Sequence, residues 1–450
     1  MKKQVWLVVP FVSFLLSGIS FHAPSTLAGG LPVPAHIAQA ALIGFPRSET
    51  HLNELIRTQA EPEIRKEAWD LFAELTEGLE PRWEKESWDT KCTLNLTRFK
   101  NICLSRAVQK PNGSIQSLMS TIFYNQSAAD WIKKNHLDDS AYLMPMIKAG
   151  DIGVPPFPRD AIVVKEIWAG FNDGPEQWQK SMTLTVYDPL AVPQNDHTLH
   201  PMQTWHNIIS LARKTNGSLD TEAPCENRTY PAARTASGTQ ATVPIQCFFF
   251  KRADQCQNLV SLAPVSEVPA SVDLSGKDPC TLVLLGVQIA TKEMDEWTWN
   301  TYWWTNDINS AFTQNRPSDR LRPAFWHFAM DTILSPATTR PVFNPYLEGP
   351  QTGGTTSNCL TCHTHAAYTA QCEGAGCSMQ LRERNGIASP ESHVAEPLKH
   401  CMAGDADIVA HKCQLQTSFL WSLATNQDAS STELPLTLHL LPGKVSIPKR

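Results

Sequence analysis

Cys359, Cys362 and His363 form a Cys-x-x-Cys-His run, which is the arrangement that attaches a c-type haem. Two thiols separated by two residues can form thioether bonds with the two vinyl-derived carbons of one haem. The histidine after the second thiol then lies beside the iron, where its imidazole is the proximal ligand. Chance is a weak explanation, because 12 cysteines and 14 histidines in 450 residues give an expected ~0.01 such runs.

The same spacing of two cysteines also occurs in other chemical sites. A Cys-x-x-Cys pair can be a structural disulfide, half of a zinc site or a redox dithiol. The histidine directly after the second cysteine favours haem over these alternatives. Because the run occurs once in the sequence, we predict one covalent haem c with its iron, bonded by Cys359 and Cys362 and ligated by His363.

The sixth iron ligand decides how such a haem is used. A methionine thioether closes the site for electron transfer and raises the potential, whereas an open position allows ligand binding or peroxide chemistry. Met402 is the first candidate, because it lies 39 residues beyond His363 (402 − 363) and before a predicted terminal helix. Met379 is the alternative. A residue in the N-terminal part of the chain is a further alternative for the sixth ligand.

The N-terminus has the features of a secretory signal peptide. Lys2 and Lys3 precede an apolar stretch over residues 5–19, and Thr26-Leu27-Ala28 offers small residues for cleavage. The apolar stretch is short and contains Pro10, unlike a membrane span. We therefore predict a signal peptide over residues 1–28, export to the periplasm or beyond, and a mature chain that is soluble.

Cysteine usage agrees with an oxidising compartment. Removing the two motif cysteines leaves ten (12 − 2), an even number that is most simply explained by disulfides. Short loops favour three local pairs, whereas the four middle cysteines can pair in three ways. The local pairs are Cys92 with Cys103, Cys372 with Cys377 and Cys401 with Cys413, and the middle four are Cys225, Cys247, Cys256 and Cys280.

The charge of the chain excludes one class of partner. Its formal net charge is −6, and loss of Lys2 and Lys3 moves it to −8 (36 − 44). A mildly acidic chain without a basic cluster is a poor nucleic-acid binder. The expected partner is instead a redox protein in the same compartment.

Periodicity indicates helices first and strands later. Apolar residues recur at three- and four-residue spacing over 61–77, and a second helical pattern covers 114–132. β-branched and alternating runs then predict strands. These expected strands are residues 161–168, 181–187, 242–250, 281–290 and 296–305, with a long loop over 215–237.

The strand over residues 296–305 contains an aromatic row. Trp297, Trp299 and Trp303 stand at odd positions, and Tyr302 and Trp304 stand at even ones. Alternation in a strand directs the two sets to opposite faces. Such a row packs a sheet core in most proteins, but it can also bind sugars or shield a haem edge.

The part of the chain around the motif is expected to be helical. A short helix is predicted near residues 324–334, a brief helix over 364–370 and a terminal helix over 416–424. The terminal helix would pack against the haem.

Three segments resemble a group of large exported bacterial proteins that contain a cytochrome c domain. They are Lys292 to Trp304, Phe343 to Leu347 and Ser357 to His363. The resemblance implies haem thioethers at Cys359 and Cys362 and proximal ligation by His363. Most of this chain precedes the motif, unlike a compact cytochrome c. The extra mass implies docking, substrate capture or a permanent partner.

These observations predict an α+β fold in which residues 29–150 are a helical segment. A disulfide-stapled, Trp-rich antiparallel β domain would cover 151–310, a mostly α cytochrome c-like haem domain 311–430 and an extended tail 431–450. The leading hypothesis is an exported monohaem cytochrome that transfers single electrons, rather than a turnover enzyme. The alternatives are a haem oxidoreductase with an open sixth position, and a ligand- or partner-binding β module with a sensory or structural haem.

Overall fold

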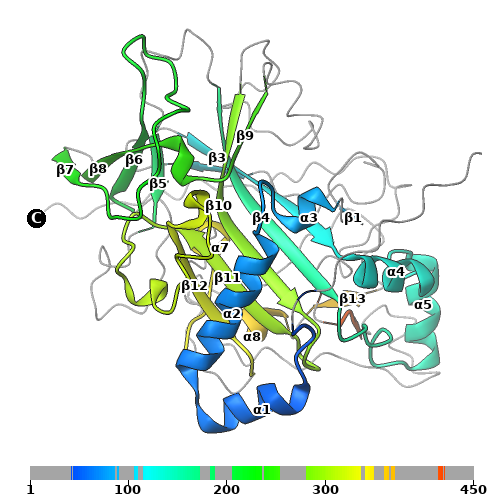
Figure 1. Cartoon of the computed structure of the whole chain (residues 1–450). Helices are drawn as coiled ribbons and strands as arrows, with labels where there is room; N and C mark the ends of the chain where they lie inside the picture. The colour runs from blue at the N-terminus through cyan, green and yellow to red at the C-terminus, as the bar shows by residue number, and fades with distance from the viewer. Residues whose placement is uncertain are drawn as a thin grey trace, which may run out of the picture. The chain divides into compact units, whose positions relative to one another are not determined.

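The longest described strand, β10 (Cys280–Thr291), lies in the middle of an antiparallel sheet. The computed structural model describes residues 42, 44–86, 89–90, 106–109, 115–172, 183–187, 205–235, 238–253, 280–335, 340–348, 359–363, 366–369, 414–418 and 420. Within these residues the sheet has eight strands (Figure 1). Their order is β1 (Asp89–Thr90), β3 (Ile115–Tyr124), β4 (Ile162–Asn172), β10, β11 (Thr298–Trp304) and β12 (Phe328–Ile333), with β2 (Arg106–Gln109) beside β3 and β9 (Phe250–Ala253) beside β10.

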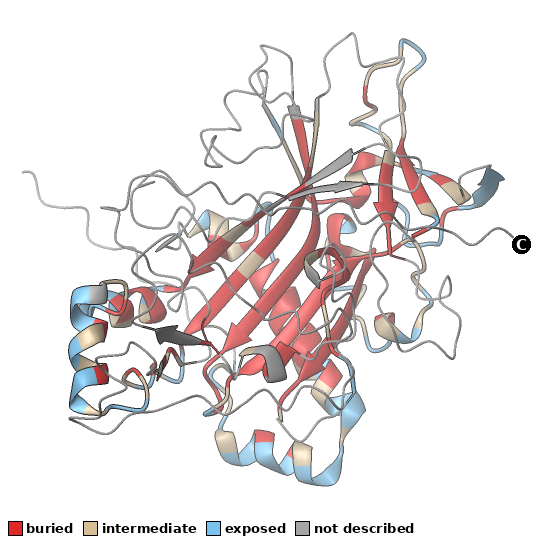
Figure 2. Ribbon diagram, turned by 180° about the vertical axis from the view of Figure 1, so that it is seen from behind, coloured by how far each residue is buried: buried red, intermediate tan, exposed pale blue. Residues whose placement is uncertain are grey.

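The central strands are buried on both faces. Every residue of β11 and β12 is buried, and so are residues 281–291 of β10 (Figure 2). Apolar, β-branched and aromatic residues that continue along a strand without alternation suit this position. The large sheet therefore holds the main apolar core, and both of its faces must be covered by other segments.

One helix covers part of one face of the sheet. The helix α2 (Glu61–Leu75) crosses the sheet, and its Phe72 ring stacks on Tyr302 at 4.2 Å (Figure 1). The Tyr302 hydroxyl donates to Ala68 O at 2.5 Å. The apolar stripe that predicted this helix is the face it buries. The preceding helix α1 (Glu49–Thr58) is capped at its N-terminus by Ser48, whose Oγ accepts from His51 N.

Further short elements border the sheet. Asn125 and Asp139 cap two helices through their side-chain oxygens, and Gly150 ends the second in a left-handed conformation. The helices are α3 (Arg82–Lys85), α4 (Gln126–Lys134), α5 (Ser140–Ala149), α7 (Pro345–Glu348) and α8 (Cys359–His363), with 3-10 turns η3 (Ile245–Cys247), η5 (Ala311–Thr313) and η6 (Pro323–Phe325).

Two smaller sheets complete the described strands. The first has the order β5 (Thr183–Val186), β6 (Asn207–Leu211), β8 (Gly238–Val243) and β7 (Ala232–Thr235), with β6 and β8 parallel. The second pairs β13 (Ala367–Thr369) with β14 (Gln414–Gln416). Residue 367 lies four positions beyond His363, the last residue of the Cys-x-x-Cys-His run.

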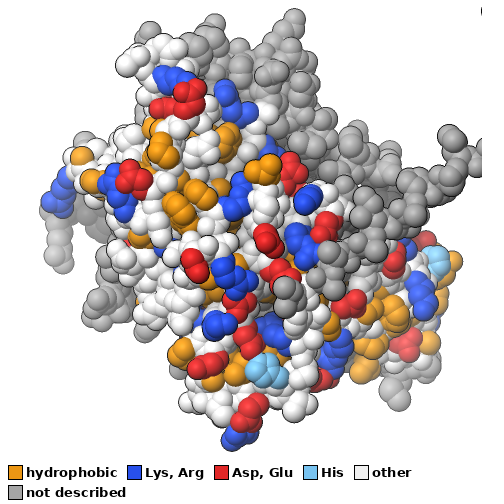
Figure 3. Space-filling model, in the orientation of Figure 1, with side chains coloured by type: hydrophobic (Ala, Val, Ile, Leu, Met, Phe, Trp, Pro, Cys, Tyr) orange, Lys and Arg blue, Asp and Glu red, His pale blue; other side chains and the backbone are white. Residues whose placement is uncertain are grey.

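Charged side chains of both signs are mixed over α1 and α2 on the face shown in Figure 3. Several form ion pairs, including Lys66 with Asp70 and Arg57 with Glu54. Exposed pairs of this kind contribute little stability. They keep the outer side of the two helices polar, while the inner side of α2 packs on the sheet.

The predicted fold class is wrong. Residues 29–150 were expected to be a helical segment, but β3 from this segment pairs along its length with β4 in the large sheet. The predicted helix over 114–132 divides into β3 and α4. The observed core is β-rich, because hydrogen bonding to β4 outweighs the weak helical pattern of residues 115–124. The helix over 61–77 and the strands near 161–168 and 281–290 are confirmed.

The mostly α haem domain is wrong in the segments that can be compared. Residues 328–333 of the predicted helix near 324–334 form β12, the outermost strand beside β11. Residues 367–369 of the predicted helix over 364–370 form β13, and its partner strand β14 includes residue 416, the first residue of the predicted helix over 416–424. Short apolar runs do not distinguish a buried strand from a helix, and pairing with a neighbouring strand decides between them. The predicted signal peptide and tail lie outside the described residues, and the domain boundaries remain predictions.

Candidate functional site

The three motif residues lie on one short helix, α8 (Cys359–His363). Residues three and four positions apart are neighbours on a helix surface. The backbone therefore brings positions 359, 362 and 363 to the same side of the helix. This is the arrangement that two thioether bonds and one axial ligand to a single haem require.

The start of α8 is fixed against the segment that contains Val342. Cys359 N donates to Val342 O at 3.0 Å, and Cys359 Sγ donates to the same oxygen at 3.1 Å. This distance suits a thiol that donates to the carbonyl, and Cys359 forms no disulfide in the described structure. Cys359 is 4% exposed and Leu360 is fully buried. The first cysteine of the motif is thus held inside the protein.

The other end of α8 rests on the aromatic strand. The imidazole of His363 lies over the indole of Trp299, with ring centroids 3.9 Å apart and planes tilted by 35°. Trp299 is buried, and its Nε1 donates to Glu296 O at 3.1 Å. Trp299 and Tyr302 point to opposite sides of β11, so α8 lies on the face away from α2.

Segments far apart in the sequence build the apolar surroundings of α8. Phe157 packs edge-on against Trp297 at 5.5 Å between centroids, and Trp297 Nε1 donates to Ser418 Oγ. Ala366 O accepts from Thr417 N just after the motif. The same apolar cluster also includes Leu143, Ile147, Val154, Val342, Leu360, Leu415 and Leu420.

This donor set fits a covalently attached haem. Cys359 forms no disulfide in the described structure and lies among apolar side chains, which suits a sulfur that would bond a haem vinyl group. His363 is only partly buried and presents an imidazole at the end of the same helix. The side chain of Cys362 and residues 364–365 lie outside the described part of the chain.

Both candidate sixth ligands, Met402 and Met379, also lie outside the described residues. Six cysteines with predicted local disulfides do too: Cys92, Cys103, Cys372, Cys377, Cys401 and Cys413. Their roles therefore remain predictions.

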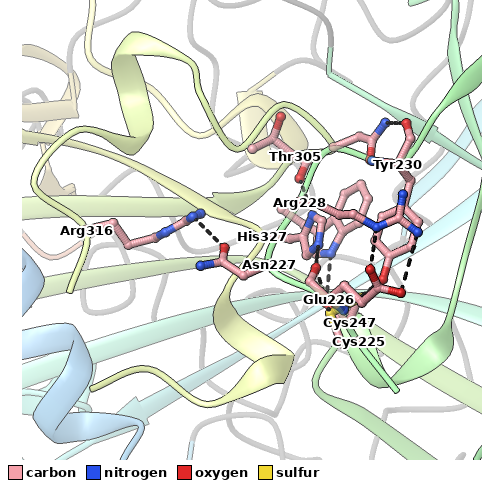
Figure 4. The surroundings of a disulfide bond; sticks show 11 residues. Cys225, Glu226, Asn227, Arg228, Tyr230, Cys247, Thr305, Arg316 and His327 are labelled. Atoms are coloured by element: carbon pink, nitrogen blue, oxygen red, sulfur yellow. Dashed lines mark hydrogen bonds and ion pairs between the residues drawn. A yellow bond between two sulfur atoms is a disulfide. The ribbon is translucent and has the colours of Figure 1, made fainter. Parts of the chain in front are cut away.

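The structure resolves one of the middle cysteine pairings. Cys225 and Cys247 form a disulfide that links the segment after β6 to η3 (Figure 4). Tyr230 OH lies 3.3 Å from Cys247 Sγ and accepts from Glu226 N. This choice among three pairings needed the tertiary fold, because the sequence alone does not rank them.

A buried histidine lies beside this disulfide. His327 Nδ1 is 3.2 Å from Thr305 O, and its Nε2 is 3.2 Å from Glu226 O (Figure 4). Burial lowers the pKa of His327 to about 4, so the ring is neutral at pH 7. The ligand atoms of Cys225, Cys247 and His327 lie within 4.8 Å of one another. Because both sulfurs are in the disulfide, this group holds no metal ion.

Glu166 is a buried polar group that the sequence analysis did not single out. Its carboxylate accepts from Trp83 Nε1 at 2.6 Å and from Trp168 Nε1 at 2.8 Å. Burial raises the pKa of Glu166 to about 8, and the nearby Glu84 adds to the effect. The signal in the sequence is a glutamate inside a β-branched, apolar run.

Comparison of the chain with protein-family models, with curated proteins and with solved structures finds no match. Among the described helices, none combines the length and the apolar composition that crossing a membrane requires.

Proposed function

We propose that this chain is an exported monohaem c-type cytochrome that passes single electrons to and from a partner protein in the periplasm. The observation that supports it is the Cys-x-x-Cys-His run on the single helix α8, whose Cys359 thiol lies in an apolar cluster. Haem iron, when bound, supplies the change between ferrous and ferric states. The residues of the chain attach the haem, orient it and exclude water.

Cys359 and Cys362 carry out the attachment in this proposal. Each S–H adds across one vinyl double bond, which forms a carbon–sulfur bond and leaves the proton on the neighbouring carbon. The addition consumes no oxidant or reductant. Cys359 enters this reaction as a thiol, in agreement with the hydrogen bond that its Sγ donates to Val342 O.

His363 provides the proximal nitrogen, and the apolar side chains around α8 limit access of water. A water-poor surrounding disfavours the extra charge of the ferric state and raises the potential. The closely packed side chains around α8 also move little when the charge of the iron changes. Both properties favour electron transfer over turnover at the haem.

The first test asks whether covalent haem is present. The full chain is produced in a bacterial host that matures c-type cytochromes, and the product is analysed by haem staining after denaturing electrophoresis and by mass spectrometry. Wild type should retain one haem. Cys359→Ala or Cys362→Ala should each lose one of two thioethers, which moves the pyridine haemochrome band to longer wavelength because one vinyl group stays unsaturated.

The matched control removes two cysteines away from the motif. The double variant Cys225→Ala/Cys247→Ala lacks the buried disulfide but should keep both thioethers and the wild-type haemochrome band. Wild-type chain without covalent haem from this host would refute the proposal, and so would two thioethers in Cys359→Ala.

The second test asks how the haem is used. A low-spin ferric spectrum and a ferrous form that does not bind carbon monoxide would support electron transfer. A high-spin ferric haem that binds carbon monoxide on reduction would overturn it in favour of an oxidoreductase or sensor.

A further inference from the structure

We propose that Trp299 is a positioning residue that holds the imidazole of His363 in one orientation and shields it from water. The proposal rests on the proposed function, because it describes how the protein tunes its own haem ligand. The contact that carries it is the stacking of the two rings, with centroids 3.9 Å apart. Metal-ligating histidines are commonly oriented by a hydrogen bond to the second ring nitrogen. Here an aromatic face provides a further restraint.

Trp299 is a rigid support. It lies within β11 between two partner strands, opposite Ala290 of β10 and Ile333 of β12. Its side chain is 5% exposed, and its Nε1 donates to Glu296 O. A buried indole fixed by a hydrogen bond and by strands on both sides has few alternative rotamers.

His363 needs such a support. It is the last residue of a helix of five residues, and its side chain is only partly buried. The helix is fixed at Cys359, which lies four residues before His363 and makes two hydrogen bonds to Val342 O. Rotation of the imidazole about its side-chain bonds would bring its edge into the indole. Trp299 therefore limits the orientations that His363 can offer to iron.

Two consequences follow for a bound haem. A single imidazole orientation gives one well-defined ligand field at the iron. The apolar indole on one side of the ligand lowers the local dielectric, which disfavours the ferric charge. Loss of Trp299 should therefore broaden the distribution of ligand orientations and lower the midpoint potential.

The test uses the haem-loaded full chain with Trp299→Leu and Trp299→Phe. Trp299→Leu should broaden or split the low-spin ferric EPR signal and lower the midpoint potential. Trp299→Phe keeps a ring face and should restore the EPR signal towards wild type. The matched control is Trp303→Phe, which changes a buried tryptophan four residues further along the same strand, where it stacks on Phe343. This control should leave both readouts at the wild-type values.

A measurement without haem separates this proposal from the proposed function. In the haem-free chain, the indole ring current should shift the His363 ring protons, and Trp299→Leu should abolish the shift. Wild-type chain that acquires no covalent haem overturns the proposed function, and the positioning role falls with it. A haem-loaded Trp299→Leu variant with wild-type EPR signal and potential overturns the positioning role alone.

Discussion

Glu166 shows how one residue can make the stability of this protein depend on pH. Its side chain is enclosed in the core, where two indoles donate to its oxygens and Lys251 is close enough to offset part of its charge. Burial, reinforced by Glu84, nevertheless raises the pKa of this carboxyl to about 8. The folded protein therefore binds a proton at Glu166 that the unfolded chain releases near its ordinary value of about 4.3.

The sign of the effect follows from this difference. Between about pH 5 and pH 8 the folded state holds one more proton at this site, so the free energy of unfolding decreases as pH rises. The slope approaches about 1.4 kcal/mol per pH unit for one proton. Urea unfolding at several pH values should show that Glu166→Gln removes this slope. The exposed Glu80→Gln should keep it, and an unchanged slope in Glu166→Gln would contradict the assignment.

At the scale of elements, β10 has an irregularity at the point where the segment before the Cys-x-x-Cys-His run packs on the sheet. The register with β4 shifts between Leu284 and Gly286. The side chain of Asn344 packs against Gly286. Its Nδ2 donates to Tyr302 O, and its Oδ1 accepts from Tyr346 N. A Cβ at Gly286 would lie 2.8 Å from Asn344 Oδ1. The absence of a side chain at Gly286 thus allows α7 to approach the sheet.

Gly286→Ala should therefore destabilise the fold by roughly 1–3 kcal/mol, because Asn344 and Ile167 must move to make room. Chemical denaturation measures the loss. In the background of Asn344→Ala, the same glycine substitution should cost less, since most of the crowding is gone. Equal costs in both backgrounds would show that the close approach is unimportant.

How far elements can be predicted depends on how local their causes are. The helix α2 has an apolar stripe that its own sequence displays, and β4 and β10 are long runs rich in β-branched residues. By contrast, residues 328–333 have no distinctive period, because β12 is buried on both faces. Residues 115–124 become a strand through pairing with β4. Such distant pairing leaves little trace in the sequence.

At the scale of the whole molecule, Arg47 joins the start of the described chain to the β10–β11 connection. Its backbone N and Nε both donate to Glu293 Oε1, at 2.7 and 2.8 Å, across 246 residues of sequence. Its guanidinium also pairs with Glu293 Oε2 and with Glu67. Glu293 is fully buried. The carboxylate therefore depends on Arg47 for the opposite charge.

Arg47→Met should cost roughly 3–5 kcal/mol in the free energy of unfolding, because it leaves a buried carboxylate without its cation. Thermal or urea unfolding measures this cost. The double variant Arg47→Met/Glu293→Gln removes the stranded charge and should recover part of the loss. A double variant as unstable as the sum of the two single variants would contradict the pairing.

The candidate site divides in the same way between local and distant causes. The candidates Cys359, Cys362 and His363 lie within five residues of sequence, so their spacing alone was enough to single them out as candidates. Trp299 lies 64 residues before His363 (363 − 299), and the sequence offered an aromatic row with several explanations. Its place against His363 follows from the packing of α8 on β11. The pairing of Cys225 with Cys247 likewise required the fold.

The burial of Cys359 has a consequence for the order of events during biogenesis. Its sulfur is enclosed between Val342 and the side chains of the surrounding cluster. Under the proposed function, an enzyme that joins haem to this sulfur would therefore have to act before α8 packs on β11. A chain that folded first would present an enclosed Cys359 to the enzyme, so prior folding would be expected to block attachment of the haem.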